Sequence, residues 1–194
     1  MGTIKTTNIE PIADNGTVTL GSSGDTFTVP SGVTVNMSSA TQTGVGGTNT
    51  PAFEAYDESI QSMSDETWTK LDVATENFDT NNNFDNSAMR FTPTVAGKYF
   101  LYAKSDCDAS GYEDMRSSEV AFYKNGSIVT YTNARVLQGG NTSNAGTVSA
   151  NFTSVILTLN GSSDYVEIYG RINALDNSNV SAMNTIFGGY KIIT

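Results

Sequence analysis

The stretch at residues 76–104, ENFDTNNNFDNSAMRFTPTVAGKYFLYAK, begins as a run of Asp and Asn and turns into an aromatic strand. Its front half, residues 79–85, places oxygen-bearing side chains at every second position, as a calcium-binding loop does. An EF-hand loop also requires a glycine at its sixth position and a bidentate acid at its twelfth. Phe84 and Arg90 occupy those two positions, so the stretch is not an EF-hand. The better interpretation is a polar turn whose aromatic residues fill the core of a β fold.

The composition favours an all-β protein. The 194 residues include 18 glycines, nine phenylalanines and nine tyrosines, and 38% of the chain is hydrophobic. Glycine, serine, threonine and asparagine suit short strands joined by tight turns, and lysine and arginine are too sparse for a helical protein. The formal net charge of −10 disfavours binding to nucleic acid, which needs a basic surface. No stretch has the apolar length of a signal peptide or a membrane span, so we expect no membrane insertion.

We do not expect an enzyme. The chain has no histidine, which excludes Ser-His-Asp and Cys-His machinery and histidine-rich metal sites. Cys107 is the sole cysteine, so no internal disulfide can form, and we expect a buried or inert thiol.

Carboxylate pairs, as in glycosidases, are the remaining catalytic option. The candidates all lie in polar, turn-like contexts, where solvated surface charge is the ordinary interpretation: Asp57 with Glu58, Asp65 with Glu66, Asp106 with Asp108, and Glu113 with Asp114. No pair stands out as an acid and a base. We therefore predict no catalytic, cofactor or metal site, with one alternative, a calcium ion held by the acidic loop 105–116.

Alternating apolar residues predict a series of strands from Pro51 onward. The expected ranges are 51–57, 67–73, 89–91, 98–104, 119–124, 127–132, 148–159, 164–172 and 183–193. Asn125-Gly126 is the strongest hairpin signal in the chain. So many strands without helical periodicity favour a sandwich or jelly roll, and residues 57–66 are the only short helix candidate.

Residues 15–36 differ in character from the rest. Apolar residues alternate with threonine in short runs, in the pairs Val18 and Leu20, Phe27 and Val29, and Val33 and Val35. Strands this short cannot bury their apolar face within one chain, so they need copies of themselves or a partner surface. Residues 38–50 lose the period and are typical of a flexible Gly/Thr linker. The predicted organisation is a β-rich anchoring leader at 1–37, a linker at 38–50 and a head domain at 51–194.

A spaced motif identifies the head. It consists of an Asn or Asp, an aromatic five residues later, a Phe seven beyond that, a Gly after six more and an aromatic two residues on. Asp79, Phe84, Phe91, Gly97 and Tyr99 fall on those positions in order. The stretches FYKNGS at 122–127, LNGSSDYVEIYG at 159–170 and TIFGGYKI at 185–192 are similar to later strands of the same family. Together these pieces resemble the globular head of complement component q and the wider tumour-necrosis-factor-like (TNF-like) jelly rolls.

The match has departures that make the chain a divergent member. Val73 stands where the motif begins with Phe, and Leu101 and Ala103 stand where it ends in aromatics. The resemblance implies a TNF-like jelly-roll sandwich assembled as a homotrimer. By position in matching strands, Tyr99, Tyr169, Phe187 and Tyr190 are the trimer-interface candidates. The alternative is that each is an aromatic residue of the protomer's own core.

The leader, TIKTTNIEP followed by GTVTLGSSGDTFTVPSGVTV, is similar to leaders of fibre and decoration proteins of tailed bacteriophages, particularly those of marine cyanobacterial phages. Three copies would also let the leader wind into a β prism or spiral. The combination implies a virion protein assembled in the host cytoplasm. Its head would attach to a host-surface glycan or protein, and residues 1–37 would contact other virion proteins. The alternatives are a capsid or tail decoration protein, and a free carbohydrate-binding or carbohydrate-active module.

Overall fold

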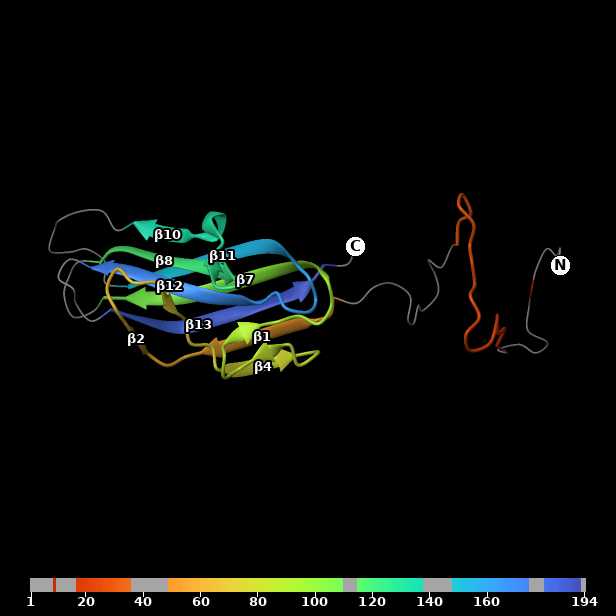
Figure 1. Cartoon of the computed structure of the whole chain (residues 1–194), viewed down its shortest axis with the longest axis horizontal. Coiled ribbons are helices and arrows are strands. Elements are labelled where there is room, and N and C mark those ends of the chain that lie inside the picture. Colours follow the sequence, from red (N-terminus) through yellow and green to blue (C-terminus); the bar gives the residue numbers. More distant parts are fainter. Residues whose placement is uncertain are drawn as a thin grey trace. The chain divides into compact units, whose positions relative to one another are not determined.

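Two units make up the chain, Met1–Val45 and Gly46–Thr194 (Figure 1). The computed structural model describes residues 9, 17–35, 49–109, 115–137, 148–174 and 180–192. The division between the units falls inside the predicted linker 38–50, most of which lies outside the described residues.

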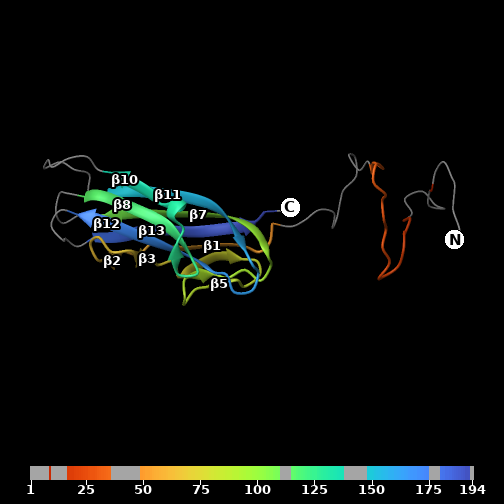
Figure 2. The same cartoon turned by 45° about the horizontal axis from the view of Figure 1, so that its top comes forward.

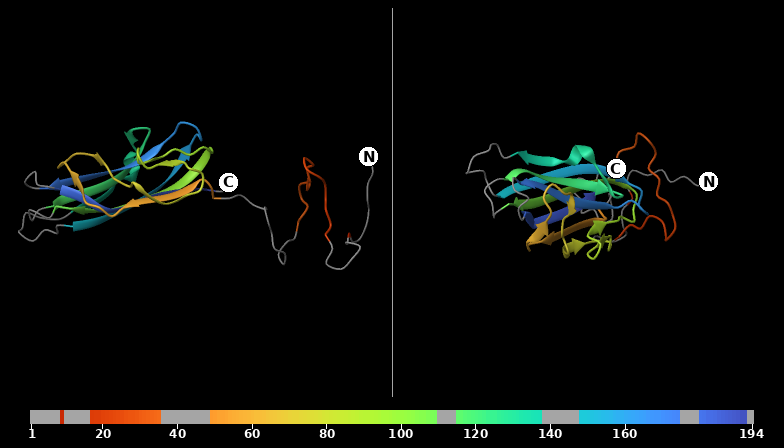
Figure 3. Two further views of the ribbon diagram at one scale, coloured as in Figure 1. Left: turned by 90° about the horizontal axis from the view of Figure 1, so that it is seen from below. Right: turned by 60° about the vertical axis from the view of Figure 1, so that its left-hand side comes forward.

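The head is a sandwich of two antiparallel sheets that lie face to face (Figures 1 and 2). The first, called the β7 sheet, runs in the order β11 (Val148–Leu159), β7 (Gly97–Asp108), β13 (Val180–Lys191), β1 (Ala52–Asp57) and β4 (Thr75–Asp79), with β2 (Gln61–Met63) beside β13. The second, called the β8 sheet, runs in the order β10 (Ala134–Leu137), β8 (Met115–Lys124), β12 (Val166–Ala174), β6 (Arg90–Phe91) and β5 (Phe84–Asp85). Short strands β3 (Thr69–Lys70) and β9 (Ser127–Ile128) pair with β12 and β8, and a 3-10 turn, η1 (Thr130–Thr132), follows β9. Figure 3 shows the long strands of both sheets running side by side along the head.

Most of the predicted strands are confirmed. Strand β11 has the predicted bounds, and β1, β7, β8, β12 and β13 overlap their predicted ranges over most of their length. The sequence prediction missed β2, β4, β5 and β10, which are short or lack alternation. The helix candidate at 57–66 is wrong, because Gln61–Met63 pairs with β13 and Met63 packs against the core. Tertiary pairing overrides weak local helix propensity there.

An aromatic cluster fills the core between the sheets. The ring of Phe53 on β1 stacks on Phe91 and Phe84, with centroids 4.2 and 5.2 Å apart, and meets the ring of Phe187 edge-on at 4.8 Å. All four side chains are at most 6% exposed. Phe84 and Phe91 therefore do fill the core, as the polar-turn interpretation of residues 76–104 predicted.

Asp79 organises that polar turn through the main chain. One carboxylate oxygen accepts a hydrogen bond from the backbone N–H of Asn81 at 3.0 Å, and the other accepts from the N–H of Phe84 at 2.7 Å. The side-chain oxygen of Asn83 accepts from the N–H of Thr94 at 3.0 Å. These oxygens satisfy backbone donors that would otherwise be left unpaired near the core. Across the residues that the structure describes, no three acidic or cysteine side chains form a group able to hold a metal ion.

The predicted hairpin at Asn125-Gly126 is confirmed. Both residues have positive φ angles, 52° and 77°, which is the signature of a type I′ turn. The turn sets Lys124 on β8 opposite Ser127 on β9.

Residues 17–35 of the leader form turns at 23–24, within GSSGD, and at 31–32, within PSG, but no strand. The six alternating apolar residues are exposed by 37% to 69%. The described residues of the leader thus do not bury its apolar pattern among themselves. In the described ranges, no helix is long and apolar enough to cross a membrane.

Candidate functional site

Apolar side chains cover part of the outer surface of the β7 sheet. Along β11, inward and outward residues alternate strictly, and the outward Val148, Phe152 and Ile156 are 51% to 62% exposed. Phe100 on β7 lies opposite Ile156, and Tyr190 on β13 lies opposite Phe100. The rings of Phe100 and Tyr190 are 5.6 Å apart between centroids. We call these five residues the apolar stripe. Large apolar side chains gathered on one outer surface are typical of a protein contact.

Tyr102 crosses the sheet next to the stripe. Its hydroxyl donates a hydrogen bond to the carboxylate of Glu54 on β1, two strands away. The ring passes over Gly188, where an added Cβ would lie 2.4 Å from the phenol. On the core side, an added Cβ at Gly189 would lie 2.5 Å from Leu101 Cδ2. The adjacent glycines thus admit one large side chain on each surface of the sheet.

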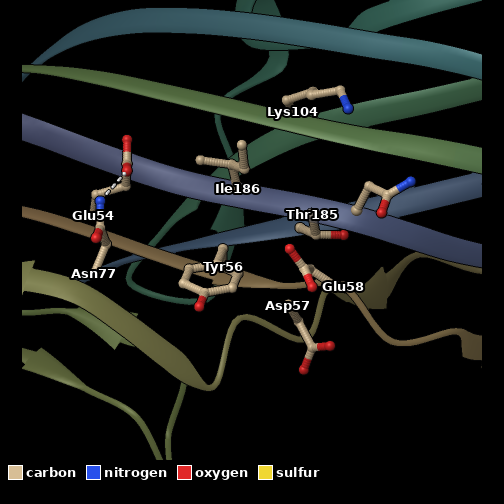
Figure 4. Close-up of a pocket in the computed structure, with 9 residues that line it drawn as sticks. Glu54, Tyr56, Asp57, Glu58, Asn77, Lys104, Thr185 and Ile186 are labelled. Carbon is tan, nitrogen blue, oxygen red and sulfur yellow. Dashed lines mark hydrogen bonds between the residues drawn. The ribbon is translucent and has the colours of Figure 1, made fainter.

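A hollow of about 360 Å³ opens on the same outer surface (Figure 4). It lies where β13 bulges, with a register shift between Met183 and Ile186 against β7 and a left-handed φ of 49° at Asn184. Asn77 donates to Glu54 at 2.8 Å at one end of the hollow, and Asp57 and Glu58 lie at the other end. The lining residues are Glu54, Tyr56, Asp57, Glu58, Asn77, Lys104, Asn184, Thr185 and Ile186.

The hollow is acidic. Three carboxylates line it, and its one lysine, Lys104, already pairs with Asp106 at 3.1 Å. Asp57 accepts from the backbone N–H of Ser59 at 2.7 Å, as expected of a turn carboxylate. This arrangement suits a basic or amide side chain of a partner better than an anionic ligand.

The four predicted interface residues fall in three different places. Tyr99 and Phe187 are fully buried within the sandwich, so the core alternative describes both of them. Tyr190 is 38% exposed within the apolar stripe, and its contact with a second chain stays a prediction. Tyr169 lies on the other sheet, stacked on Tyr123 with ring centroids 3.9 Å apart.

Cys107 is fully buried, as predicted. Burial raises the pKa of its thiol to about 12, so it stays protonated and unreactive near neutral pH. The alternative calcium loop at 105–116 begins within β7 and ends within β8, and its residues 110–114 lie outside the described residues.

No protein-family model and no curated protein matches the sequence. Solved structures do match. The structure of Eiger TNF from S. frugiperda is 12% identical, with a TM-score of 0.50, over 73% of this chain and 91% of that chain. The head is a TNF/C1q-like jelly roll.

Two other solved structures match the jelly roll with lower scores. The globular domain of zebrafish complement 1qA protein is 14% identical over 73% of this chain and 97% of that chain, with a TM-score of 0.47. Murine APRIL is 11% identical over 73% of this chain and 98% of that chain, with a TM-score of 0.46. At such identities the likeness concerns the fold alone, and it does not bear on the predicted virion role.

Sequence reasoning missed most of the stripe. A signal was present in β11, where Val148, Phe152 and Ile156 recur at every fourth position, out of phase with the buried residues. On the jelly roll's β7, Tyr99 and Phe100 are adjacent aromatics, and the sequence alone does not say which one points outward.

Proposed function

We propose that this chain is a trimeric virion structural protein, a short fibre or appendage of a tailed bacteriophage whose head attaches to the host surface. The observation that carries the self-association is the apolar stripe. It places Phe152, Ile156 and Tyr190 in water on the outside of a sheet whose inner side is already packed. A second and third copy that cover this surface would remove it from water, and apolar burial is the main favourable contribution to such assembly.

The leader supplies the second half of the proposal. Its apolar residues, such as Leu20 at 62% and Phe27 at 69% exposed, are not buried by the other described residues of the leader. A trimer brings three leaders to one place, where they can pack on one another or on other virion proteins. The resemblance of the leader to those of phage fibre and decoration proteins supports the virion setting. We propose binding and assembly, with no catalytic role.

Three linked heads would also strengthen weak contacts with a host. Each added contact becomes intramolecular once the first has formed, so avidity exceeds the affinity of one head. This fits a receptor-binding tip that recognises a repeated glycan or protein on a cell surface.

The first test is the mass of the purified chain, measured by size-exclusion chromatography with light scattering. We expect three copies at micromolar concentration. A stable monomer would contradict the trimer on which both the fibre and the decoration proposals depend. A chain that begins at Gly46 is the matched control, because it keeps the whole head unit and lacks the leader. We expect it to remain trimeric if the stripe drives assembly.

The second test locates the protein on particles by electron microscopy of antibody-labelled virions and by copy counting. A copy number that follows tail symmetry supports the appendage, and purified trimer should then block adsorption of the virus to its host. A copy number that follows the capsid lattice instead supports decoration of the shell, the alternative function.

A further inference from the structure

The outer surface of the β8 sheet gathers the guanidinium groups of the chain. All four arginines, Arg90, Arg116, Arg135 and Arg171, lie on its strands β6, β8, β10 and β12. In a chain with a net charge of −10, this makes the β8 sheet the place where a negatively charged group is least repelled.

Aromatic rings lie beside these arginines. The rings of Tyr123 on β8 and Tyr169 on β12 stack at 3.9 Å with an angle of 28° between their planes. Trp68 approaches Tyr123 edge-on at 6.0 Å. Along β12, Ile168 is buried while Tyr169 is half-buried on the outer surface, so the stack is a platform on rigid strands.

The carboxylates on this surface are already engaged. Glu167 accepts a hydrogen bond from Lys70 at 2.7 Å, and Glu119 pairs with Arg135 at 3.6 Å and accepts from Asn133. Neither carboxylate pairs with Arg116 or Arg171.

Arg90 and Arg135 pair with Glu167 and Glu119 at 3.9 and 3.6 Å, whereas Arg171 on β12 has no anionic partner among the described residues. It makes no hydrogen bond or ion pair within the described part of the chain, and its Nε atom is buried without a partner. It lies two residues from Tyr169 on the same outer surface of β12, beside the stack. A guanidinium presents a planar fork of donors that matches a carboxylate, and leaving such a group unpaired costs free energy.

We propose that this platform binds an acidic sugar, whose carboxylate pairs with Arg171 and whose ring lies on the Tyr123–Tyr169 stack. The inference rests on the proposed attachment function and names the chemical class of its receptor. The strongly acidic chain repels a densely charged polyanion, so a glycan with isolated carboxylates fits better than nucleic acid.

The test titrates the full-length chain with sialyllactose, which carries one carboxylate, and with lactose, its neutral core, by calorimetry and NMR. We expect binding to sialyllactose and none to lactose. Arg171→Gln should weaken binding by about tenfold or more, the usual effect of losing a charge-assisted hydrogen-bonded pair. Tyr169→Ala should weaken binding similarly. The affinity of Arg171→Lys for sialyllactose should lie between those of wild type and Arg171→Gln, because lysine keeps the charge but lacks the planar fork of donors.

Arg116→Gln is the matched control, since it removes the same charge from an exposed arginine of the same sheet. It should change the affinity by less than about twofold, as expected for a distant surface charge. Circular dichroism spectra verify that each variant keeps the wild-type fold.

The proposal would be overturned by no binding of sialyllactose, by equal binding of lactose, or by unchanged affinity in Arg171→Gln. Equal competition by a glutamate-rich peptide would identify a peptide site instead and also overturn it. Failure of the proposed function can be distinguished from failure of this binding site. A monomeric mass contradicts the trimer whatever the sugar titration shows, and host adsorption retained by Arg171→Gln leaves attachment standing while this site fails.

Discussion

The hydroxyl of Tyr102 on β7 donates a hydrogen bond to the carboxylate of Glu54 on β1, and the ring passes over Gly188 of the strand between them. Three neighbouring strands are thereby joined on the outer surface of the β7 sheet. Burial and the bond to Glu54 raise the pKa of Tyr102 above its ordinary value of 10, so the phenol remains a donor at any physiological pH. This contact is possible only because Gly188 has no side chain.

Gly188→Ala should destabilise the head by about 1–3 kcal/mol, since the new methyl group and the Tyr102 ring cannot both occupy the space. Urea unfolding monitored by tryptophan fluorescence measures the loss. Tyr102→Ala in the G188A background removes the ring that the methyl group meets, so the two changes should cost less together than their sum. Strict additivity would show that the ring and Gly188 do not interact.

Phe152→Ser combined with Ile156→Ser should weaken self-association without unfolding the protomer. Both side chains are more than half exposed, so the single chain loses little packing while an assembled interface loses apolar burial. Light scattering over a dilution series measures the shift toward monomer. Leu137→Ser, which removes a 68% exposed leucine from the other sheet, is the control and should leave the mass unchanged. An unchanged mass in the double variant would place the interface elsewhere.

Asp79→Ala should lower the free energy of unfolding by about 1–3 kcal/mol, because two backbone N–H groups of the polar turn lose their acceptors. Asp79→Asn should cost less, since the amide oxygen still accepts from one of them. Glu76→Ala on the same strand removes the same charge from an exposed position and is the control for charge alone. Because Asp79 serves the backbone, calcium or a chelator should not change the thermal midpoint, and a calcium-dependent midpoint that vanishes in Asp79→Ala would restore the metal interpretation.

Cys107 should resist thiol reagents in the native protein at pH 8 and react fully after denaturation. Its pKa rises from 9.0 to about 12 through burial, so the unfolded chain ionises its thiol first as the pH is raised. The stability that this thiol contributes is therefore complete below pH 9 and is lost progressively between pH 9 and 12. Urea unfolding across that pH window should show a smaller decline in the free energy of unfolding of Cys107→Ala than of wild type. Rapid labelling of the folded protein at pH 8 would contradict the buried thiol.

Local pattern was sufficient for much of the fold. The spacing of Phe84, Phe91 and Gly97 identified the turn and its core aromatics, and Asn125-Gly126 identified the hairpin. Short strands such as β4 and β10 were missed because they are held by pairing with β1 and β8 rather than by their own alternation.

Predicting the candidate sites required knowing which residues of each strand face outward and how neighbouring strands pair. On β12, Tyr169 and Arg171 alternate with buried Ile168 and Ile172, so their common surface was readable from the sequence. The stack of Tyr169 on Tyr123 was not, because it depends on how β12 pairs with β8. Tyr99, proposed for an interface, is in the core because its neighbour Phe100 takes the outer position.

The sequence by itself determined the all-β class, the turn that follows Asp79, the lack of histidine chemistry and the separate character of the leader. Each of these depends on residue type and on short-range spacing, which a linear chain displays directly. Only the tertiary structure decided which aromatics are buried, which line the apolar stripe and which join Arg171. Those assignments follow from the register between strands distant in the chain and from the side of each sheet that packs against the other, and shifting a strand by one residue would exchange its two surfaces.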